Sequence, residues 1–209
     1  RDALQRAVLA ALPDATVHTA DSVPALFALI ESLPDADLLL MDLHMPGARG
    51  YSALAHIRGQ YPGLPTIVVS GHEEGQIARR ALAHGASAYI PKSAAVEQIV
   101  EAVRTVLDGD VWLPHQLVGG SVELKADEAD VAARVASLTP KQFRVLTMIA
   151  EGLLNKQIAY DLGVSEATVK AHMTAIMRKL GVSNRTQVAL AASHLDVEKE
   201  TFPGVSQEG

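Results

Sequence analysis

The stretch that decides the fold is Leu38-Leu39-Leu40-Met41-Asp42-Leu43-His44-Met45-Pro46-Gly47. Its leading apolar residues are followed by a carboxylate, a pattern typical of a strand that helices cover on both faces of a parallel sheet. In such sheets ligands bind at the carboxyl ends of the strands, where Asp42 would lie. An aspartate at this place is also a common cap of the following helix, so Asp42 alone does not separate a site from a cap.

Strand-like and helix-like segments alternate on both sides of this stretch. The helix period is present over 2–12, 24–33, 51–60, 74–84 and 94–107, and strand-like runs cover 15–20, 37–42, 66–70 and 88–92. This alternation predicts right-handed βαβ units and therefore a doubly wound α/β domain over 1–113. The pattern opens on a helix, so the strand expected to lead it is not in this sequence.

Two more polar side chains end neighbouring strands. Ser70 ends the run before Gly71, and Lys92 ends the last run, shortly after Tyr89. Because the ends of parallel strands meet at one edge, a carboxylate, a hydroxyl and an ammonium group should lie together. The set suits an aspartyl phosphate, in which Asp42 attacks phosphorus while the other two groups hold the phosphoryl oxygens. Taken singly, Ser70 is equally well a strand-end hydroxyl and Tyr89 a core aromatic.

The second half of the chain has a different periodicity. Residues 114–137 are predicted to be a linker in which 127–137 forms a short helix. From 138 to 195 the period is purely helical and predicts four helices, the first with a capping box at Thr139-Pro140-Lys141-Gln142. Residues 196–209 are polar and expected to form a frayed tail.

The middle of this helical region has the signals of a helix, a tight turn and a second helix. Asn155 and Ser165 are placed to cap the second and third helices, and Gly163 and Gly181 to end them. The apolar face of the third helix consists of Val169, Met173, Ile176 and Leu180. Its other face carries Lys170, Ala171, Thr174 and Arg178.

Such a helix can enter the major groove of DNA, where a lysine reads guanine edges. The flanking candidates for phosphate contacts are Thr168, Lys156, Lys179 and Arg185. A helical bundle with an ordinary solvated face is the alternative that the pattern leaves open.

Charge is divided unevenly along the chain. The net charge is −6, yet 138–195 carries seven Lys/Arg against three Asp/Glu, hence +4, and the remainder carries −10. This asymmetry favours a basic DNA-facing module joined to an acidic domain, although chance segregation of solvated charge would look the same. The chain has no cysteine and no apolar run near the roughly 20 residues that cross a bilayer, so we expect a cytoplasmic protein without a membrane segment.

The first 113 residues resemble a receiver domain of bacterial two-component systems. The matching motifs are Leu40-Met41-Asp42-Leu43-His44-Met45-Pro46-Gly47, Val69-Ser70-Gly71 and Ala88-Tyr89-Ile90-Pro91-Lys92. The resemblance implies a flavodoxin-like sheet with Asp42 as phosphoacceptor, Ser70 as switch hydroxyl, Lys92 as phosphoryl clamp and Tyr89 as the aromatic that rotates. It also implies a cognate histidine kinase as partner.

Residues 138–195 resemble a LuxR-type helix-turn-helix domain. The matching residues include Asn155-Lys156-Gln157-Ile158-Ala159, Val164-Ser165-Glu166-Ala167-Thr168-Val169-Lys170-Ala171-His172 and Lys179-Leu180-Gly181-Val182. With the receiver this indicates the NarL/FixJ family of response regulators. The resemblance implies that Lys170, Ala171 and Thr174 face bases, and that a homodimer forms through the last helix, here 186–192.

One departure from the family concerns the metal. The resemblance implies a Mg²⁺ site made of Asp42, the backbone carbonyl of His44 and an acidic pair on the first strand, and that pair is absent from this chain. Mg²⁺ demands an octahedral oxygen shell that Asp42 alone cannot supply. We therefore expect Mg²⁺ to serve phosphorylation of the intact protein, and the chain as written to be phosphorylated poorly.

Three other functions compete with a phosphorylated transcription regulator. An aspartyl phosphatase of the haloacid-dehalogenase kind needs a second aspartate where His44 stands, which disfavours an enzyme. A LuxR-type regulator that senses a small molecule would leave the strand-end Asp, Ser and Lys unexplained. The serious alternative is a LuxR-type regulator with a degenerate receiver that controls DNA binding without phosphate.

Overall fold

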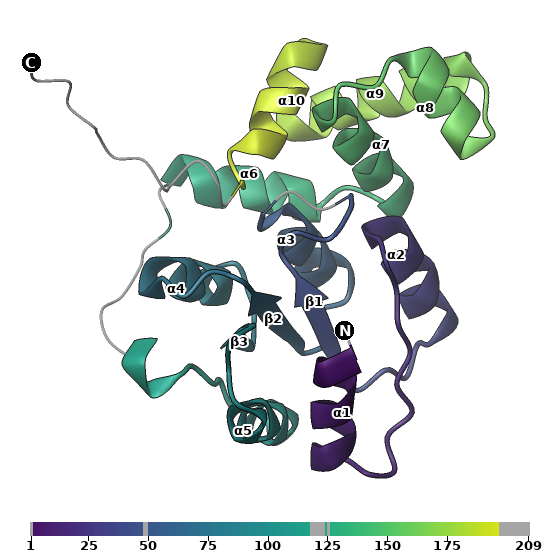
Figure 1. The fold of residues 1–209 in the computed structure, drawn as a ribbon. Coiled ribbons are helices and arrows are strands. Elements are labelled where there is room, and N and C mark those ends of the chain that lie inside the picture. The colour runs from purple at the N-terminus through teal and green to yellow at the C-terminus, as the bar shows by residue number, and fades with distance from the viewer. Residues whose placement is uncertain (1, 48–49, 118–123, 125, 197–209) are drawn as a thin grey trace, which may run out of the picture.

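The computed structural model describes residues 2–47, 50–117, 124 and 126–196 (Figure 1). In chain order the elements of the first half are α1 (Asp2–Ala11), α2 (Val23–Ser32), β1 (Leu39–Asp42), α3 (Ser52–Gln60), β2 (Thr66–Ser70), α4 (Gly75–Ala83), β3 (Ala88–Pro91), α5 (Val96–Leu107) and the 3₁₀ turn η1 (His115–Leu117). The second half holds α6 (Ala126–Ala136), α7 (Pro140–Ala150), α8 (Asn155–Leu162), α9 (Glu166–Leu180) and α10 (Arg185–Ser193).

The three strands form a parallel sheet in the order β1-β2-β3. Asp42 lies beside Val69 in the β1–β2 register, and Ser70 lies beside Pro91 in the β2–β3 register. The doubly wound arrangement predicted for this region is therefore confirmed. All residues of β2 and β3 are buried, because helices cover both faces of the sheet.

Alternate residues of each strand reach two separate apolar layers. One face, with Ile67, Val69 and Ile90, packs against α1 and α5. The opposite face, with Val68 and Tyr89, packs against α2, α3 and α4. Figure 1 shows α1 and α5 on one side of the sheet and α3 and α4 on the other.

The strand predicted over 15–20 is wrong. These residues have no regular secondary structure, although Val17 packs partly against the α1–α5 layer. A strand is defined by its hydrogen bonds to a neighbour, and no backbone hydrogen bond joins 16–20 to another part of the described chain. Alternating apolar residues alone therefore do not produce a strand.

The linker holds a helix that packs along α3. The short helix predicted over 127–137 is observed as α6, and residues 118–123 and 125 of the predicted linker lie outside the described residues. Gly59 of α3 makes the close approach possible: a Cβ added there would stand 2.6 Å from both the Cβ and the carbonyl oxygen of Ala136. The helix buries Ala132 and Val135, so the linker is part of the folded molecule.

The four C-terminal helices and most of their capping signals are as predicted. Thr139 and Gln142 form the capping box of α7, and the Ser165 hydroxyl accepts a hydrogen bond from the Thr168 amide at the start of α9. Gly163 and Gly181 end α8 and α9 in the left-handed region, at φ 63° and 70°.

The predicted cap of α8 is wrong by one residue. Leu154 occupies the N-cap position, and its amide donates to Oε1 of Gln157 at 2.7 Å. Asn155 is the first residue of the helix, and its Oδ1 accepts instead from Arg185 at 3.0 Å. The glutamine replaces the side-chain cap because it reaches back over the first turn.

The C-terminal helices continue the core of the α/β domain. Phe143 of α7 contacts the Phe27 ring of α2 edge-on at 5.6 Å and stacks on the His56 ring of α3 at 4.4 Å. The Tyr51 amide donates to the Leu195 carbonyl at 2.7 Å. One apolar cluster therefore runs from the sheet face through α2 and α3 into α7, α9 and α10.

Candidate functional site

The sequence-predicted site residues at the sheet edge do come together. Asp42 at the end of β1 forms an ion pair with Nζ of Lys92, which follows β3, through its Oδ2. Its Oδ1 accepts a hydrogen bond from the His44 amide at 3.0 Å. The side chains of Asp42 and Lys92 remain 29% and 52% exposed. The carboxylate is thus held in place and remains partly open to solvent.

Ser70 and Tyr89, the other two predicted residues of this site, are buried in the interior. The Ser70 side chain is fully buried, and its hydroxyl accepts from the His72 amide at 3.3 Å. Tyr89 is also fully buried and donates from Oη to the His72 carbonyl at 2.8 Å. Burial raises the pKa of Tyr89 to about 12, and the neighbouring Ser70 hydroxyl opposes the shift. The tyrosine is therefore a neutral donor that ties β3 to the loop after β2.

Two imidazoles beside Asp42 were not among the predicted side-chain contacts. Nδ1 of His44 lies 3.8 Å from Oδ1 of Asp42, and the rings of His44 and His72 are 5.1 Å apart. Each histidine lies two residues past a strand-end residue, Asp42 or Ser70. The rule that the ends of parallel strands share one edge could therefore have predicted both histidines near the carboxylate. Lys92 and the His44 ring therefore both lie next to the Asp42 carboxylate, and the His72 ring lies against His44.

The described residues do not fit a Mg²⁺ ion. Asp42 and the His44 carbonyl are the predicted oxygen ligands, and Lys92 already pairs with one carboxylate oxygen. Within the described part of the chain no three His, Cys, Asp or Glu side chains are grouped so as to hold a metal. An octahedral oxygen shell needs more ligands than these.

The α9 face predicted to meet DNA is exposed. Val169, Met173, Ile176 and Leu180 are buried, as the helix period predicts. The exposed residues of the opposite face are Lys170, Ala171, Thr174 and Arg178. Lys156 on α8 is also exposed, whereas Thr168 is half-buried with its hydroxyl 2.9 Å from that of Ser165.

Two cations expected at DNA phosphates are bound to the chain itself. Nζ of Lys179 donates to the Ser137 carbonyl at 2.7 Å. Arg185 donates to Asn155 and to the Leu153 carbonyl. Lys179 thus joins α9 to the end of α6, and Arg185 joins α10 to the α7–α8 connection; their contacts to DNA phosphates stay a prediction.

A buried polar cluster, which sequence patterns did not indicate, joins the linker helix to α4. Glu128 of α6 accepts from Arg80 at 2.5 Å and contacts Nε2 of His84 at 2.7 Å. Side-chain exposures are 8% for Glu128, 12% for Arg80 and 1% for His84. The Tyr51 ring stacks on His84 at 4.7 Å. We call Arg80, His84 and Glu128 the α4–α6 cluster.

A second buried histidine lies where α3 meets α6 and α7. His56 is fully buried, and its Nδ1 lies 3.4 Å from the Val135 carbonyl. Its Nε2 has no hydrogen-bond partner within the described residues. Burial lowers the pKa of His56 to about 4, with Lys179 acting in the same direction and the Val135 carbonyl against it. A neutral imidazole is therefore buried at the junction of α3, α6 and α7.

Comparisons with known proteins bear on both halves. A family model described as bacterial regulatory proteins, luxR family, matches residues 136–192, and a response regulator receiver domain model matches residues 2–104. The chain is 34% identical over 201 residues to the glycerol metabolism activator of Pseudomonas putida, covering 94% of this chain and 91% of the relative. It is 35% identical over 165 residues to the nitrate/nitrite response regulator protein NarL of Escherichia coli K12, covering 78% and 75%.

Among solved structures, the chain is similar to RcsB from Salmonella enterica serovar Typhimurium bound to promoter P1flhDC in the presence of phosphomimetic BeF3⁻. The TM-score is 0.50 at 24% identity, covering 93% of this chain and 95% of that one. This likeness supports the fold.

No helix in the described part of the chain is both long and apolar enough to span a bilayer.

Proposed function

Because the chain belongs to the two-component response regulators that join a receiver domain to a LuxR-type DNA-binding domain, we propose that phosphorylation of Asp42 controls its binding to DNA. Members of this family regulate transcription, and their output is DNA binding rather than catalysis. The observation that carries the proposal for Asp42 is its carboxylate at the end of β1, open to solvent and paired with Lys92. The comparisons do not favour the phosphorylation-independent alternative.

The proposed chemistry follows from the groups around the carboxylate. A carboxylate oxygen of Asp42 attacks phosphorus of the donor, the donor's bond to phosphorus breaks, and the leaving group keeps the electron pair. Lys92 then exchanges its ion pair with the carboxylate for one with the phosphoryl group. The His44 amide, which donates to Asp42, and the Ser70 hydroxyl at the end of the neighbouring strand are the proposed further donors to the phosphoryl oxygens. The natural donor is proposed to be the phosphohistidine of a cognate kinase.

The route from Asp42 to the DNA-binding helices is proposed to pass through α4 and α6. Tyr89 donates to the His72 carbonyl in the loop that leads into α4. Helix α4 carries Arg80, which holds Glu128 of α6. At its other end α6 contacts α9, because Nη1 of Arg134 donates to the Leu180 carbonyl at 3.0 Å. A shift of the loop after β2 therefore changes contacts on both sides of the linker helix.

DNA recognition is assigned to the exposed face of α9. Lys170 and Arg178 can donate to guanine edges in the major groove, Thr174 can donate or accept, and Ala171 can contact a thymine methyl group. The proposed phosphate contacts are the exposed Lys156 together with Thr168, Lys179 and Arg185. The recognition face is exposed in this arrangement, so control does not require uncovering it.

The partners follow from the same proposal. They are double-stranded DNA, a histidine kinase and a second copy of the chain, which would act together in the bacterial cytoplasm where the DNA lies. Receiver domains generally use Mg²⁺ for phosphorylation. Of such a ligand shell the described residues offer only Asp42 and the His44 carbonyl, which are too few for an octahedral Mg²⁺ site.

The test measures affinity for promoter DNA with and without a small acyl phosphate donor, in the presence and absence of Mg²⁺. Phosphorylation is expected to tighten binding by about 5- to 150-fold, the usual range of coupling between two sites. Asp42→Asn should show no response to the donor. Equal affinities for wild-type protein with and without the donor, after its phosphorylation has been verified by mass, would support the phosphorylation-independent alternative.

Base recognition has its own test. Lys170→Ala is expected to weaken binding to the specific site by about 1–3 kcal/mol and to relax sequence preference. Lys141→Ala, which removes an exposed cation from α7, should leave sequence preference unchanged. Equal loss on all sequences for Lys170→Ala would mean that this lysine contacts only phosphate.

A further inference from the structure

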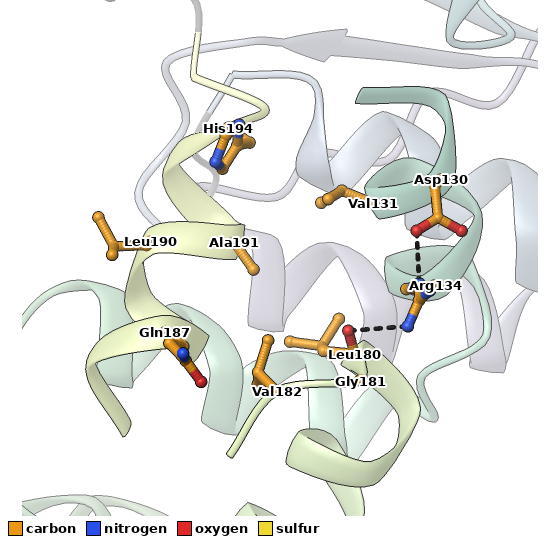
Figure 2. Close-up of a pocket in the computed structure, with 10 residues that line it drawn as sticks. All are labelled: Asp130, Val131, Arg134, Leu180, Gly181, Val182, Gln187, Leu190, Ala191 and His194. Atoms are coloured by element: carbon orange, nitrogen blue, oxygen red, sulfur yellow. Dashed lines mark hydrogen bonds and ion pairs between the residues drawn. The ribbon is translucent and has the colours of Figure 1, made fainter. Parts of the chain in front are cut away.

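The ends of the linker helix α6 and of α9 are bonded to each other through two cationic side chains. Nη1 of Arg134 on α6 donates to the Leu180 carbonyl at the end of α9, at 3.0 Å. In return, Nζ of Lys179 on α9 donates to the Ser137 carbonyl just after α6, at 2.7 Å. Figure 2 shows the first of these bonds, with Arg134 also held by Asp130 of its own helix. Because the last carbonyls of a helix have no partner within it, each cation caps the other helix.

The receiver holds the same end of α6. Nε2 of Gln60 on α3 donates to the Ala136 carbonyl at 2.9 Å, and Nδ1 of His56 lies 3.4 Å from the Val135 carbonyl. The carbonyls of residues 135–137, which we call the α6 end, are therefore contacted by side chains of both α3 and α9. The α6 end is thus a joint at which polar side chains of the receiver and of the DNA-binding helix meet on one turn of chain.

Beside this joint α6 does not pack closely on α10. An open groove of about 320 Å³ lies between α6, the turn after α9 and α10, and Val131, Leu180 and Ala191 are among the residues that line it (Figure 2). A small shift of the α6 end relative to α10 therefore disrupts no tight packing between these two helices.

The Lys179 bond is the contact of this joint that can be exchanged at the lowest cost. It is accessible to solvent, whereas the Gln60 bond is half-buried and the His56 contact is buried. Its acceptor is a neutral carbonyl. A phosphate oxygen adds the attraction between opposite charges to the same hydrogen bond. Since Lys179 follows Arg178 of the exposed α9 face, DNA lying along α9 offers Nζ a stronger acceptor than the α6 end does.

We propose that Nζ of Lys179 exchanges the Ser137 carbonyl for a DNA phosphate oxygen when α9 binds DNA. The inference rests on the proposed function and deepens it, because the phosphate contact of Lys179 becomes conditional on the state of α6. In the free protein the bond to Ser137 competes with DNA and holds α9 on the linker helix. Arg134 keeps its bond to Leu180, so α9 stays attached to α6 while the other bond is exchanged.

The exchange makes the α6 end and the DNA site sensitive to each other. Coupling between two sites is reciprocal: if DNA draws Lys179 away from Ser137, a change that loosens the α6 end tightens binding to DNA by the same factor. Phosphorylation of Asp42, which is proposed to reach α6 through α4, acts in this direction. One lysine thereby contributes both to affinity for the DNA backbone and to the control of that affinity by the receiver.

Hydrogen exchange at the α6 end, with and without saturating promoter DNA, tests this change of partner. The amides of Ser137 and Leu138 report on it, because they close the last turn on carbonyls of residues 133–135. DNA is expected to speed their exchange in the wild-type protein. In Lys179→Met the exchange should be fast in the free protein and should not change further with DNA. Lys156→Met is the matched control, because it removes an exposed lysine also proposed at a phosphate and should leave the response of the α6 end to DNA intact.

The salt dependence of DNA binding is measured on the same proteins. Both lysine variants should lower the slope of log affinity against log salt concentration by about 1. An unchanged slope for Lys179→Met, or unchanged exchange at the α6 end of DNA-saturated wild-type protein, would overturn the proposal while leaving the proposed function intact. A wild-type protein that binds no DNA at low salt would overturn the proposed function together with this inference.

The change in DNA affinity on phosphorylation tests the regulatory side. The tightening produced by the phosphodonor should be smaller in Lys179→Met by about 2- to 12-fold, which is the effect of one hydrogen bond. Lys179→Arg keeps a cation at this position and should keep the wild-type tightening, as should Lys156→Met. Equal tightening in Lys179→Met and Lys156→Met would mean that the receiver acts on α9 through other contacts, and would overturn the regulatory role of Lys179.

Discussion

Two carboxylates of this molecule pair with cationic side chains in opposite surroundings, Asp42 at the surface and Glu128 in the interior. At the sheet edge Asp42 pairs with Lys92, and their side chains are 29% and 52% exposed. In the α4–α6 cluster Glu128 pairs with Arg80 and His84, whose exposures are 8%, 12% and 1%. Water competes for an exposed pair, so it breaks at little cost, whereas a buried carboxylate that loses its partner costs several kcal/mol. The first pair suits a group that must react, and the second suits a group that must hold two parts together.

The strongest test of this difference removes the buried carboxylate. Glu128→Ala leaves the Arg80 guanidinium in the interior without this partner, and the free energy of unfolding should fall by about 3–5 kcal/mol. Asp130→Ala is the matched control: it lies on the same helix, and its pair with Arg134 is exposed at 57% and 41%. Urea unfolding should show a loss below about 1 kcal/mol for the control. Similar losses for both variants would remove the distinction between the two pairs.

Acid should weaken the junction through His56. Burial lowers its pKa from 6.5 in the unfolded chain to about 4, so between these values the unfolded state binds more protons than the folded one. The contribution of the neutral His56 to stability is fully present above pH 6.5 and is lost as the pH falls toward 4. Near pH 5 the free energy of unfolding should already have fallen by about 2 kcal/mol. His84, whose pKa burial also lowers, acts in the same direction.

The measurement is the free energy of unfolding against pH for wild-type protein and His56→Gln. The variant should retain only the part of the slope that comes from His84 and the carboxylates. Parallel curves for the two proteins would exclude His56 as the source of the pH dependence of stability.

The packing of α3 against α6 can be tested with a substitution that changes no charged group. Gly59→Ala would place a Cβ 2.6 Å from the Cβ and carbonyl oxygen of Ala136, so α3 and α6 must separate. We expect a loss of at least about 1 kcal/mol in thermal or urea unfolding. Gly63→Ala, where a Cβ meets nothing within 4 Å, should be neutral or stabilising by up to about 1 kcal/mol. A stabilised Gly59→Ala protein would mean that the two helices do not pack this closely.

The smallest effect is expected at the sheet edge. Asp42→Asn keeps the size of the side chain and breaks only a partly exposed ion pair, so the free energy of unfolding should change by less than about 1 kcal/mol. The same variant is expected to abolish the response to a phosphodonor. A large loss of stability would indicate that Asp42 has a structural role like that of Glu128.

The two regions also differ in how far they could be predicted. Asp42, Ser70 and Lys92 follow from a general rule, because the ends of parallel strands share one edge whatever the rest of the chain does. The faces of α9 follow in the same way from the 3.6-residue period. The α4–α6 cluster has no such local rule, since His84 and Glu128 are 44 residues apart in the sequence and meet only through the packing of α6 on the first domain.

The errors have the same origin. Residues 15–20 alternate as a strand does, but no described neighbour completes a ladder. Asn155 is predicted to cap α8 because of its residue type and position, and only the fold reveals that its Oδ1 accepts from Arg185 instead. Local patterns determine an element and its faces, whereas the partner of a long polar side chain depends on tertiary structure.

Hydrogen exchange of the α6 amides (Ala126–Ala136) tests the central claim most directly, because it observes the buried junction while chemistry occurs at the exposed site. Wild-type protein and Asp42→Asn are compared before and after treatment with the phosphodonor, with modification verified by mass. The account predicts that exchange in α6 changes on phosphorylation of the wild-type protein and does not change in Asp42→Asn. Unaltered exchange in α6 of a fully phosphorylated protein would contradict the link between Asp42 and the DNA-binding helices.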